Sequence, residues 1–147
     1  MSFVLTRETI DRISDNIEEI LEVVKEISKL SPEMIMSDRR ISMAFRYCFI
    51  TLIQAILTFS NYIIVKRKLG IPRDYRESLM SLFDAKILDP SIEDEVVELV
   101  KVRETLLYKG ASITITDIKN TAEKANLVID VYRKILNEVK NIISEKK

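Results

Sequence analysis

A long uncharged segment is the feature of this sequence that most limits how it can fold. Residues 47–65 contain no charged side chain, with Arg46 on one side and Lys66 on the other. As a helix, the segment just reaches the length of about 20 residues that spans a membrane. Polar side chains stripe it at helical spacing, whereas a lipid-facing helix is apolar all round; they are Thr51, Gln54, Thr58, Ser60 and Asn61. We therefore expect a helix buried inside a water-soluble protein, with no membrane contact.

Both ends of the chain carry apolar residues at steps of three and four, the spacing of one helix face. The first series predicts a helix over residues 6–30, capped by Thr6 and ended by residues 31–32; its members are Ile10, Ile13, Ile17, Ile20, Val24 and Ile27. The second predicts a helix capped by residues 116–117; its members are Ile118, Ala122, Ala125, Val128, Val131, Ile135, Val139 and Ile142. These two are the longest amphipathic helices that we expect.

Three further helices are predicted between them. The second helix of the chain covers residues 37–69 and stops at Gly70, a residue that tolerates the left-handed conformation common at helix ends. The third covers residues 74–85. The fourth covers residues 90–110 and is capped by Asp89.

Short connections between these helices favour a helical bundle. Residues 113–115 alternate like a strand, but one short segment has no partner strand in this sequence, so we expect an extended connection. With two glycines and three prolines, the economical fold is all-α, an up-and-down bundle of about five helices. We expect a single domain over residues 1–147. The stripes of the first and last helices could equally close a bundle between two chains, so we also expect a homodimer.

The composition excludes several classes of function. The 23 basic side chains cancel the 23 acidic ones, so no general attraction to polyanions follows. The single cysteine, Cys48, cannot form an internal disulfide, and without histidine a zinc site is not expected. Residues 1–7 are too short an apolar run for a signal peptide and lack a basic start. We expect a cytoplasmic protein with no metal and no cofactor.

The end of the predicted fourth helix carries the motif of most interest. Residues 103–110 read Arg-Glu-Thr-Leu-Leu-Tyr-Lys-Gly. They resemble the signature of the HEPN superfamily, most closely of its HepT-like ribonuclease toxins: Arg-Asn, three mostly apolar residues, His, any residue and Tyr. Arg103 matches the family arginine. Glu104 stands in place of the asparagine, Tyr108 in place of the catalytic histidine, and Gly110 in place of the tyrosine.

This resemblance covers roughly residues 38–116. Residues 46–58 look like the family's long second helix, residues 69–77 like its following turn, and residues 82–88 like its next helix and exit. The resemblance implies an HEPN-like bundle that dimerises, bringing two motifs together in a cleft where RNA is cut without metal. It also implies a protein partner, usually a small nucleotidyltransferase that acts as antitoxin.

The chemistry of the family requires groups that this chain lacks. Metal-free RNA cleavage needs a base for the 2′-hydroxyl and an acid for the leaving oxygen, roles that suit histidine because its pKa lies near neutrality. A phenol, with a pKa of about 10, is a poor base at neutral pH. Arg103 can still hold a phosphate in a bidentate way. Glu104 is the only nearby carboxylate that could act as the base, and Tyr108 is the only side chain at the histidine position.

Other positions of the resemblance depart in the same direction. Gln54 and Thr58 stand where the family's second helix often has acidic residues, and Tyr62 stands where it often has another histidine. In the family the nucleotidyltransferase can modify the last tyrosine of the motif, whereas Gly110 cannot accept a nucleotide. The joint absence of ionisable groups is what a loss of catalysis would look like.

The motif residues also have purely structural interpretations. Arg103 lies near a helix C-terminus, where it can interact with the helix dipole or pair with Glu98 or Glu104. Tyr108 can be a partly buried aromatic residue with its hydroxyl at the surface.

Basic side chains cluster around the predicted second helix, and acidic ones are frequent on the first. The favoured interpretation is a solvated, self-complementary surface within or between subunits, ahead of an RNA or nucleotide groove. The basic residues are Arg39, Arg40, Arg46, Lys66, Arg67, Lys68, Arg73 and Arg76.

Three hypotheses follow for the function. The first is a homodimeric HepT-like component of a toxin–antitoxin or nucleotidyltransferase pair, with weakened or lost ribonuclease activity, that binds its partner protein, RNA or both. The second is an active metal-free ribonuclease toxin that uses Arg103 with Glu104 or Tyr108. The third is a substrate-binding subunit of a nucleotidyltransferase.

Overall fold

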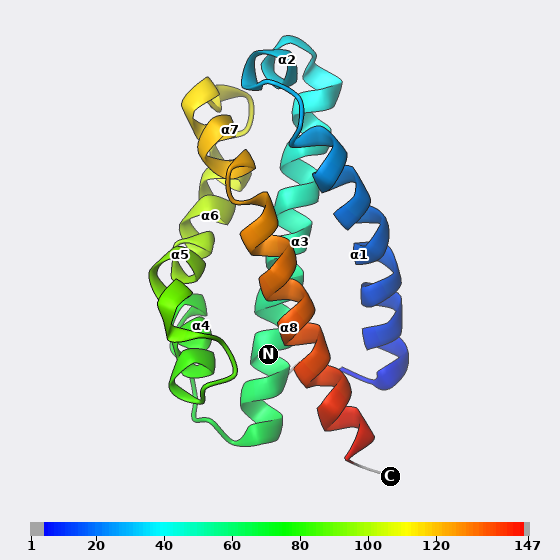
Figure 1. The fold of residues 1–147 in the computed structure, drawn as a ribbon, viewed down its shortest axis with the longest axis vertical. Helices are drawn as coiled ribbons and strands as arrows, with labels where there is room; N and C mark the ends of the chain where they lie inside the picture. The colour runs from blue at the N-terminus through cyan, green and yellow to red at the C-terminus, as the bar shows by residue number, and fades with distance from the viewer. Residues whose placement is uncertain (1–4, 146–147) are drawn as a thin grey trace.

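Three long helices form the frame of the molecule (Figure 1). In the computed structural model, which describes residues 5–145, α1 (Arg7–Ile27) and α8 (Ala125–Ser144) both pack against the central helix α3 (Arg39–Arg67). The segments α4 to α7 stack along the other side of α3 and α8, and α2 (Pro32–Ser37) lies at one end. The described residues contain no strand, so the predicted all-α, up-and-down arrangement is confirmed. Residues 1–4, within the segment in which we expect no signal peptide, lie outside the described residues.

The uncharged segment forms most of α3 and supplies the centre of the core. By length and composition alone α3 could cross a membrane, but 67% of its most apolar window is buried inside the protein. Its fully buried side chains are Phe45, Phe49, Leu52, Ile53, Ile56, Leu57, Phe59 and Ile63. The burial predicted from the polar stripe is therefore observed.

The first helix is shorter than predicted, because the chain forms an additional helix after it. Thr6 caps α1 as expected, but α1 ends at Ile27 and not at residue 30. Residues 31–32 do not simply end a helix. Ser31 accepts a hydrogen bond from the Met34 N–H, and Pro32 occupies the first turn of α2. Proline suits that position because the first N–H groups of a helix have no partner within it.

The second and third helices agree closely with the prediction. Asp38 caps α3 through the Arg40 N–H at 2.8 Å, and Asp74 caps α4 (Tyr75–Asp84) through the Glu77 N–H at 2.9 Å. The end of α3 differs: Lys68, with a φ of 56°, takes the left-handed position, and Gly70 lies beyond it.

The predicted fourth and fifth helices are both broken. The fourth consists of η1 (Pro90–Ile92), α5 (Glu93–Val97) and α6 (Leu99–Lys109), and the fifth of α7 (Ile115–Ala122) and α8. The pieces bury their apolar faces against different neighbours: α5 contacts α4, α6 contacts α3, α7 contacts α2, and α8 contacts α3. Because one straight helix could not reach two such neighbours, the chain changes direction between them.

The start of α7 also differs from the prediction. Ile113 and Thr114 are extended, as expected, but Ile115 already belongs to α7. Thr114, and not Thr116, accepts the capping hydrogen bond.

Ion pairs join the long helices at their solvent edges. Arg67 at the end of α3 binds two carboxylates of α8, Glu138 at 3.1 Å and Glu145 at 2.7 Å. Arg133 of α8 lies 3.2 Å from Glu18 of α1. For these residues, basic and acidic side chains therefore pair within one subunit, which is one of the two arrangements expected for the charged surface.

Candidate functional site

The motif segment ends α6 and turns the chain into α7. Gly110 follows the last residue of α6 with a φ of 53° and a ψ of −122°, which has the positive φ that glycine tolerates but is not the left-handed helical conformation. After the short turn η2 (Gly110–Ser112), a reciprocal capping box opens α7. In it the Asp117 N–H donates to Thr114 Oγ1 at 3.1 Å, and the Thr114 N–H donates to Asp117 Oδ2 at 3.0 Å. The Lys109 ammonium donates to the same Oδ2 at 2.9 Å, which ties the end of the motif to α7.

The donors around this carboxylate shift its acidity. The hydrogen bond from the Thr114 backbone, followed by that from Lys109, holds the pKa of Asp117 below its usual value. The group therefore stays ionised and can act as the anchor of the turn over a wider pH range.

Arg103 is half-buried on the side of α6 that faces the start of α4. Its guanidinium carbon lies 5.4 Å from the centre of the Tyr75 ring, an arrangement suited to cation–π attraction. Among residues 5–145 no ion pair joins it to Glu98 or Glu104, so the predicted pairing is wrong. Its Nε is buried and has no hydrogen-bond partner among these residues.

Glu104 faces a different part of the surface. It is exposed and lines a hollow of about 500 Å³ between α4, α5 and α6, beside Arg76 and Lys101. One step along an α-helix rotates a side chain by about 100°. The structure therefore does not bring Glu104 to the guanidinium of Arg103.

Tyr108 is also separate from Arg103. Five steps along the helix place it about 140° around the axis. Its side chain is 78% exposed, so the prediction of a partly buried aromatic residue is wrong. Within one subunit the three predicted site residues do not form a common site.

A residue outside the predicted site, Arg46, reaches the motif from α3. A Cβ atom built on Gly110 would lie 3.5 Å from Nη1 of Arg46, so the guanidinium is packed over the glycine. Arg46 is half-buried, and its Nε, like that of Arg103, is buried without a partner among the described residues. The sequence placed Arg46 in the basic cluster around the second helix, but nothing in it indicated an approach to the motif.

The predicted polar stripe of α3 lies partly at the surface. Gln54 and Thr58 are half-buried, are joined by a hydrogen bond of 3.3 Å, and line a groove of about 300 Å³ between α1 and α3. Met43, Tyr47 and Val65 continue the same helix face and are 54%, 59% and 72% exposed. An uncharged strip thus runs along one side of α3; we call it the α3 strip, formed by Met43, Tyr47, Thr51, Gln54, Thr58, Asn61 and Val65.

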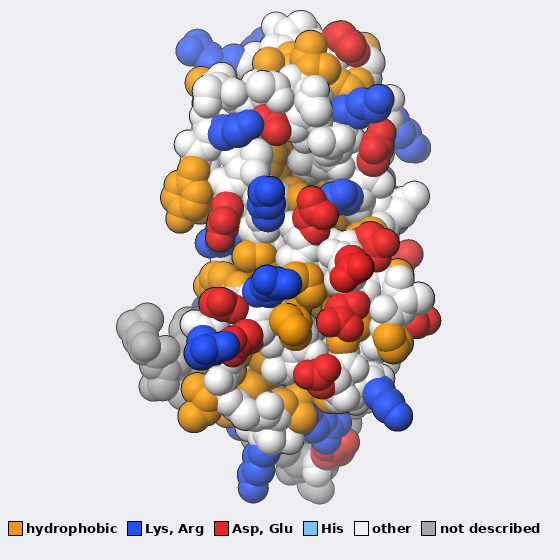
Figure 2. All heavy atoms as spheres, turned by 90° about the vertical axis from the view of Figure 1, so that its left-hand side faces the viewer, with side chains coloured by type: hydrophobic (Ala, Val, Ile, Leu, Met, Phe, Trp, Pro, Cys, Tyr) orange, Lys and Arg blue, Asp and Glu red, His pale blue; other side chains and the backbone are white. Residues whose placement is uncertain are grey.

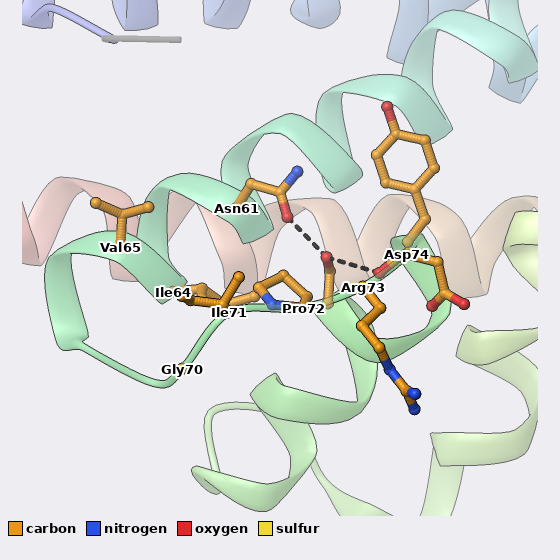
Figure 3. Close-up of a pocket in the computed structure, with 10 residues that line it drawn as sticks. Asn61, Ile64, Val65, Gly70, Ile71, Pro72, Arg73 and Asp74 are labelled. Atoms are coloured by element: carbon orange, nitrogen blue, oxygen red, sulfur yellow. Dashed lines mark hydrogen bonds between the residues drawn. The ribbon is translucent and has the colours of Figure 1, made fainter. Parts of the chain in front are cut away.

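At the end of the α3 strip, the turn into α4 forms the largest hollow described here. It measures about 580 Å³, and Figure 3 shows Val65, Ile71 and Pro72 beside it. Ser78 Oγ donates to Asn61 Oδ1 at 2.7 Å and so joins the two helices beneath it. Ile71 is 95% exposed, and most of the exposed lining is apolar, so this hollow suits an apolar partner surface.

The surface formed by α4 to α7 has a different character. Figure 2 shows acidic and basic side chains interspersed over much of it, with several acidic side chains gathered together in one part. The part of the chain that the structure describes contains no group of three or more Cys, Asp or Glu side chains arranged to hold a metal ion.

Comparison with known structures shows which proteins share this fold. The chain resembles the crystal structure of a toxin–antitoxin with AMP-PNP, with a TM-score of 0.72 at 13% identity over 90% of this chain and 97% of that chain. It resembles equally a tri-AMPylated Shewanella oneidensis HEPN toxin in complex with MNT antitoxin, with a TM-score of 0.72 at 12% identity over 92% and 99%. A mutant of the toxin–antitoxin MntA-HpeT gives a TM-score of 0.71 at 13% identity over 90% and 97%. At such identities the likeness shows the fold, which is that of the HEPN toxins.

The sequence gives the narrower assignment. The family model "Ribonuclease HepT-like" matches residues 13–145, nearly the whole chain. The chain therefore belongs to the HepT-like ribonuclease family of the HEPN superfamily, as the motif resemblance predicted. Comparison with curated protein sequences found no significant match.

Proposed function

We propose that this chain is the HepT-like component of a toxin–antitoxin or nucleotidyltransferase pair, that its ribonuclease activity is weak or lost, and that it acts by binding its partner protein and RNA. One observation carries the loss of activity. The chain contains no histidine, and the two residues that could replace it, Glu104 and Tyr108, both point away from Arg103.

The remaining chemistry at the motif suits binding better than cleavage. Arg103 retains a guanidinium that can donate hydrogen bonds to a phosphate, and among residues 5–145 it forms no ion pair with a carboxylate. Proton transfer in RNA cleavage contributes about 10²- to 10⁴-fold to the rate. A site that lacks both proton-transfer groups is expected to lose much of that factor.

We place the homodimer contact on the α3 strip. The strip is uncharged from Tyr47 to Val65, and these ends are about 27 Å apart at 1.5 Å per residue. A stable interface buries about 800 Å² per partner and depletes charge at its centre. The flanking groove and the apolar hollow at the α3–α4 turn supply further area for a second copy of the chain.

The proposal of a nucleotidyltransferase partner rests on the structural relatives. One of them is a HEPN toxin in complex with MNT antitoxin, and two others are toxin–antitoxin structures. The Tyr108 hydroxyl is then the accessible phenol of the motif and the group that a nucleotidyltransferase could modify, since Gly110 has none.

The first experiment is metal-free cleavage of a mixed RNA by the purified protein, together with Arg103→Ala and Tyr108→Phe. We expect no cleavage at enzyme concentrations well above trace contamination. Cleavage that disappears with Arg103→Ala would overturn the proposal and establish a ribonuclease that works without histidine. Cleavage that persists in Arg103→Ala at the same level would indicate a contaminant.

A second experiment tests the partner. The chain is co-expressed with a nucleotidyltransferase from the same genome, and the complex is sought by size exclusion. Co-elution supports the pair, and its mass shows whether two copies of the chain are present. Growth arrest when the chain is expressed alone would favour an active toxin; a stable complex without toxicity fits both a binding component and a substrate-binding subunit.

A further inference from the structure

The arginines of this chain fall into two groups that the sequence does not distinguish. Three of them are half-buried: Arg46, Arg67 and Arg103. Arg67 is matched by two carboxylates of α8, Glu138 and Glu145. No carboxylate of residues 5–145 lies within ion-pair distance of the other two.

The two unmatched arginines lie on one side of α6. Arg103 and Gly110 are seven residues apart, two helical turns, so they share a face of the helix. Arg46 is packed over Gly110, and Arg103 lies against the Tyr75 ring. This side of α6 therefore carries two guanidinium groups from two different helices.

Both groups have unused hydrogen-bonding capacity. In each, Nε is buried and has no partner among the described residues. Burying a charge or an N–H donor without a partner is unfavourable, and the structure retains two such cases side by side along one helix. An oxyanion bound at the outer N–H groups of each guanidinium would neutralise its unpaired charge, and a guanidinium fork suits phosphate geometry.

Gly110 is part of the same arrangement. A Cβ at this position would already touch Nη1 of Arg46 at 3.5 Å, so a large side chain would displace the guanidinium. The position that holds a tyrosine in the family signature has here lost its side chain, and an arginine from α3 occupies the adjoining space. The chain thus has a cation where a phenol would stand.

We propose that Arg46 is a phosphate-binding residue, which acts with Arg103 to hold the phosphate groups of an RNA strand or of a nucleoside triphosphate on this side of α6. The inference rests on the proposed role of the chain as an RNA- and partner-binding component. It names the second cation of that site.

The test compares two arginines of α3 that differ in their surroundings. Arg46→Gln removes the proposed contact. Arg40→Gln removes the same charge six residues earlier, from a side chain that is 92% exposed and lies 3.6 Å from Asp38. Binding of a fluorescein-labelled single-stranded RNA is measured by anisotropy for the wild type, both variants and Arg103→Gln, and binding of ATP without metal is measured by calorimetry.

We expect Arg46→Gln and Arg103→Gln each to weaken binding about tenfold, the effect of one charge-assisted hydrogen bond, and Arg40→Gln to change it less than about twofold. For RNA, a plot of log K against log salt concentration should have a slope of about −1.4 for the wild type, which neutralises two phosphates, and of about −0.7 for Arg46→Gln. If only RNA binding depends on both arginines, the phosphates belong to an RNA strand. If only ATP binding depends on both, the phosphates belong to a nucleotide.

Equal effects of Arg46→Gln and Arg40→Gln, or a wild type that binds neither probe, would overturn the proposal. A protection experiment on the wild type covers the case in which Arg46→Gln fails to fold. Phenylglyoxal modifies accessible arginines, and bound RNA or ATP should protect Arg46 but not Arg40 when the products are read by mass spectrometry; equal labelling with and without the probe contradicts the proposal. Co-elution with a nucleotidyltransferase does not enter either readout, so the failure of this inference is distinguishable from failure of the proposed partnership.

Discussion

Helices α1, α3 and α8 contain 21, 29 and 20 residues, whereas α4, α5, α6 and α7 contain 10, 5, 11 and 8. The long helices pack along one another and bury continuous apolar stripes. Among the short helices, α4 and α6 contact α3, α5 contacts α4, and α7 contacts α2. Side chains cap the starts of α4 and α7. The motif lies entirely in the short-helix region. The two regions therefore differ in what holds them: packing in the first, and local hydrogen bonds together with packing in the second.

The largest expected effect is the loss of stability when a core side chain of the long-helix region is truncated. Phe59 of α3 is fully buried and stacks on Tyr132 of α8, with ring centres 6.1 Å apart. Phe59→Ala should lower the free energy of unfolding by about 3–5 kcal/mol, since it removes apolar contacts and leaves a cavity. Urea denaturation measures the change. Arg39→Ala on the same helix, at an exposed side chain outside the α3 strip, should change it by less than about 0.5 kcal/mol. Similar values for the two variants would contradict the assignment of α3 as the packed centre.

Hydrogen exchange should separate the two regions without mutation. The amides of α5 belong to a helix of five residues, and we expect them to open without global unfolding. Their protection factors should be at least about 100-fold lower than those of residues 52–59 in α3, equivalent to about 2.7 kcal/mol. Native-state exchange followed by mass spectrometry or NMR provides the comparison. Equal protection in both regions would show that the short helices unfold only with the frame.

The capping box of α7 should be a main local support of the motif turn. Asp117→Ala removes the acceptor for Lys109 and for the Thr114 N–H, and should lower the free energy of unfolding by about 1–2 kcal/mol. Asp130→Ala on α8 is the matched control, at an exposed carboxylate within a long helix, and should leave stability unchanged or slightly raised. Thermal or urea unfolding measures both. A loss as large for Asp130→Ala would indicate a general charge effect.

The same carboxylate should give the smallest and most specific effect, a dependence on pH. The pKa of Asp117 is lowered in the folded protein by hydrogen bonds from Thr114 and Lys109. Its stabilisation is therefore fully present above the ordinary aspartate pKa of about 3.9 and is lost as the pH falls through the lower folded value. The difference in stability between the wild type and Asp117→Ala should accordingly shrink below about pH 4. A difference that stays constant between pH 6 and pH 3 would exclude an ionised anchor.

Much of the long-helix frame follows from local sequence. Thr6 and Asp89 cap helices as predicted, because a side-chain oxygen at a helix start needs only the next few backbone N–H groups. The stripe from Ile10 to Ile27 is buried as its spacing required. The prediction failed at the breaks between helices. It missed α2 and did not divide the fourth and fifth helices, because the direction of a short helix depends on the neighbour that it packs against.

The candidate site divides in the same way. The glycine turn at Gly110 and the resemblance around Arg103 were read from adjacent residues, and the family assignment agrees with them. The separation of Glu104 and Tyr108 from Arg103 depends on rotation about α6, and the approach of Arg46 depends on how α3 packs against α6. Neither could be read from the spacing of residues along the motif.

The sequence by itself determined where the long helices lie, which residues are apolar enough to form the core, and which catalytic group is missing, because these are properties of composition, periodicity and local hydrogen bonding. The tertiary structure alone decided where the short helices turn and which charged groups meet. Whether a half-buried arginine forms an ion pair depends on side chains that are distant in the sequence. Arg67 pairs with two carboxylates of α8, whereas Arg46 lies against Gly110. Such pairings depend on distances of a few ångströms between packed helices, which no pattern along one helix contains.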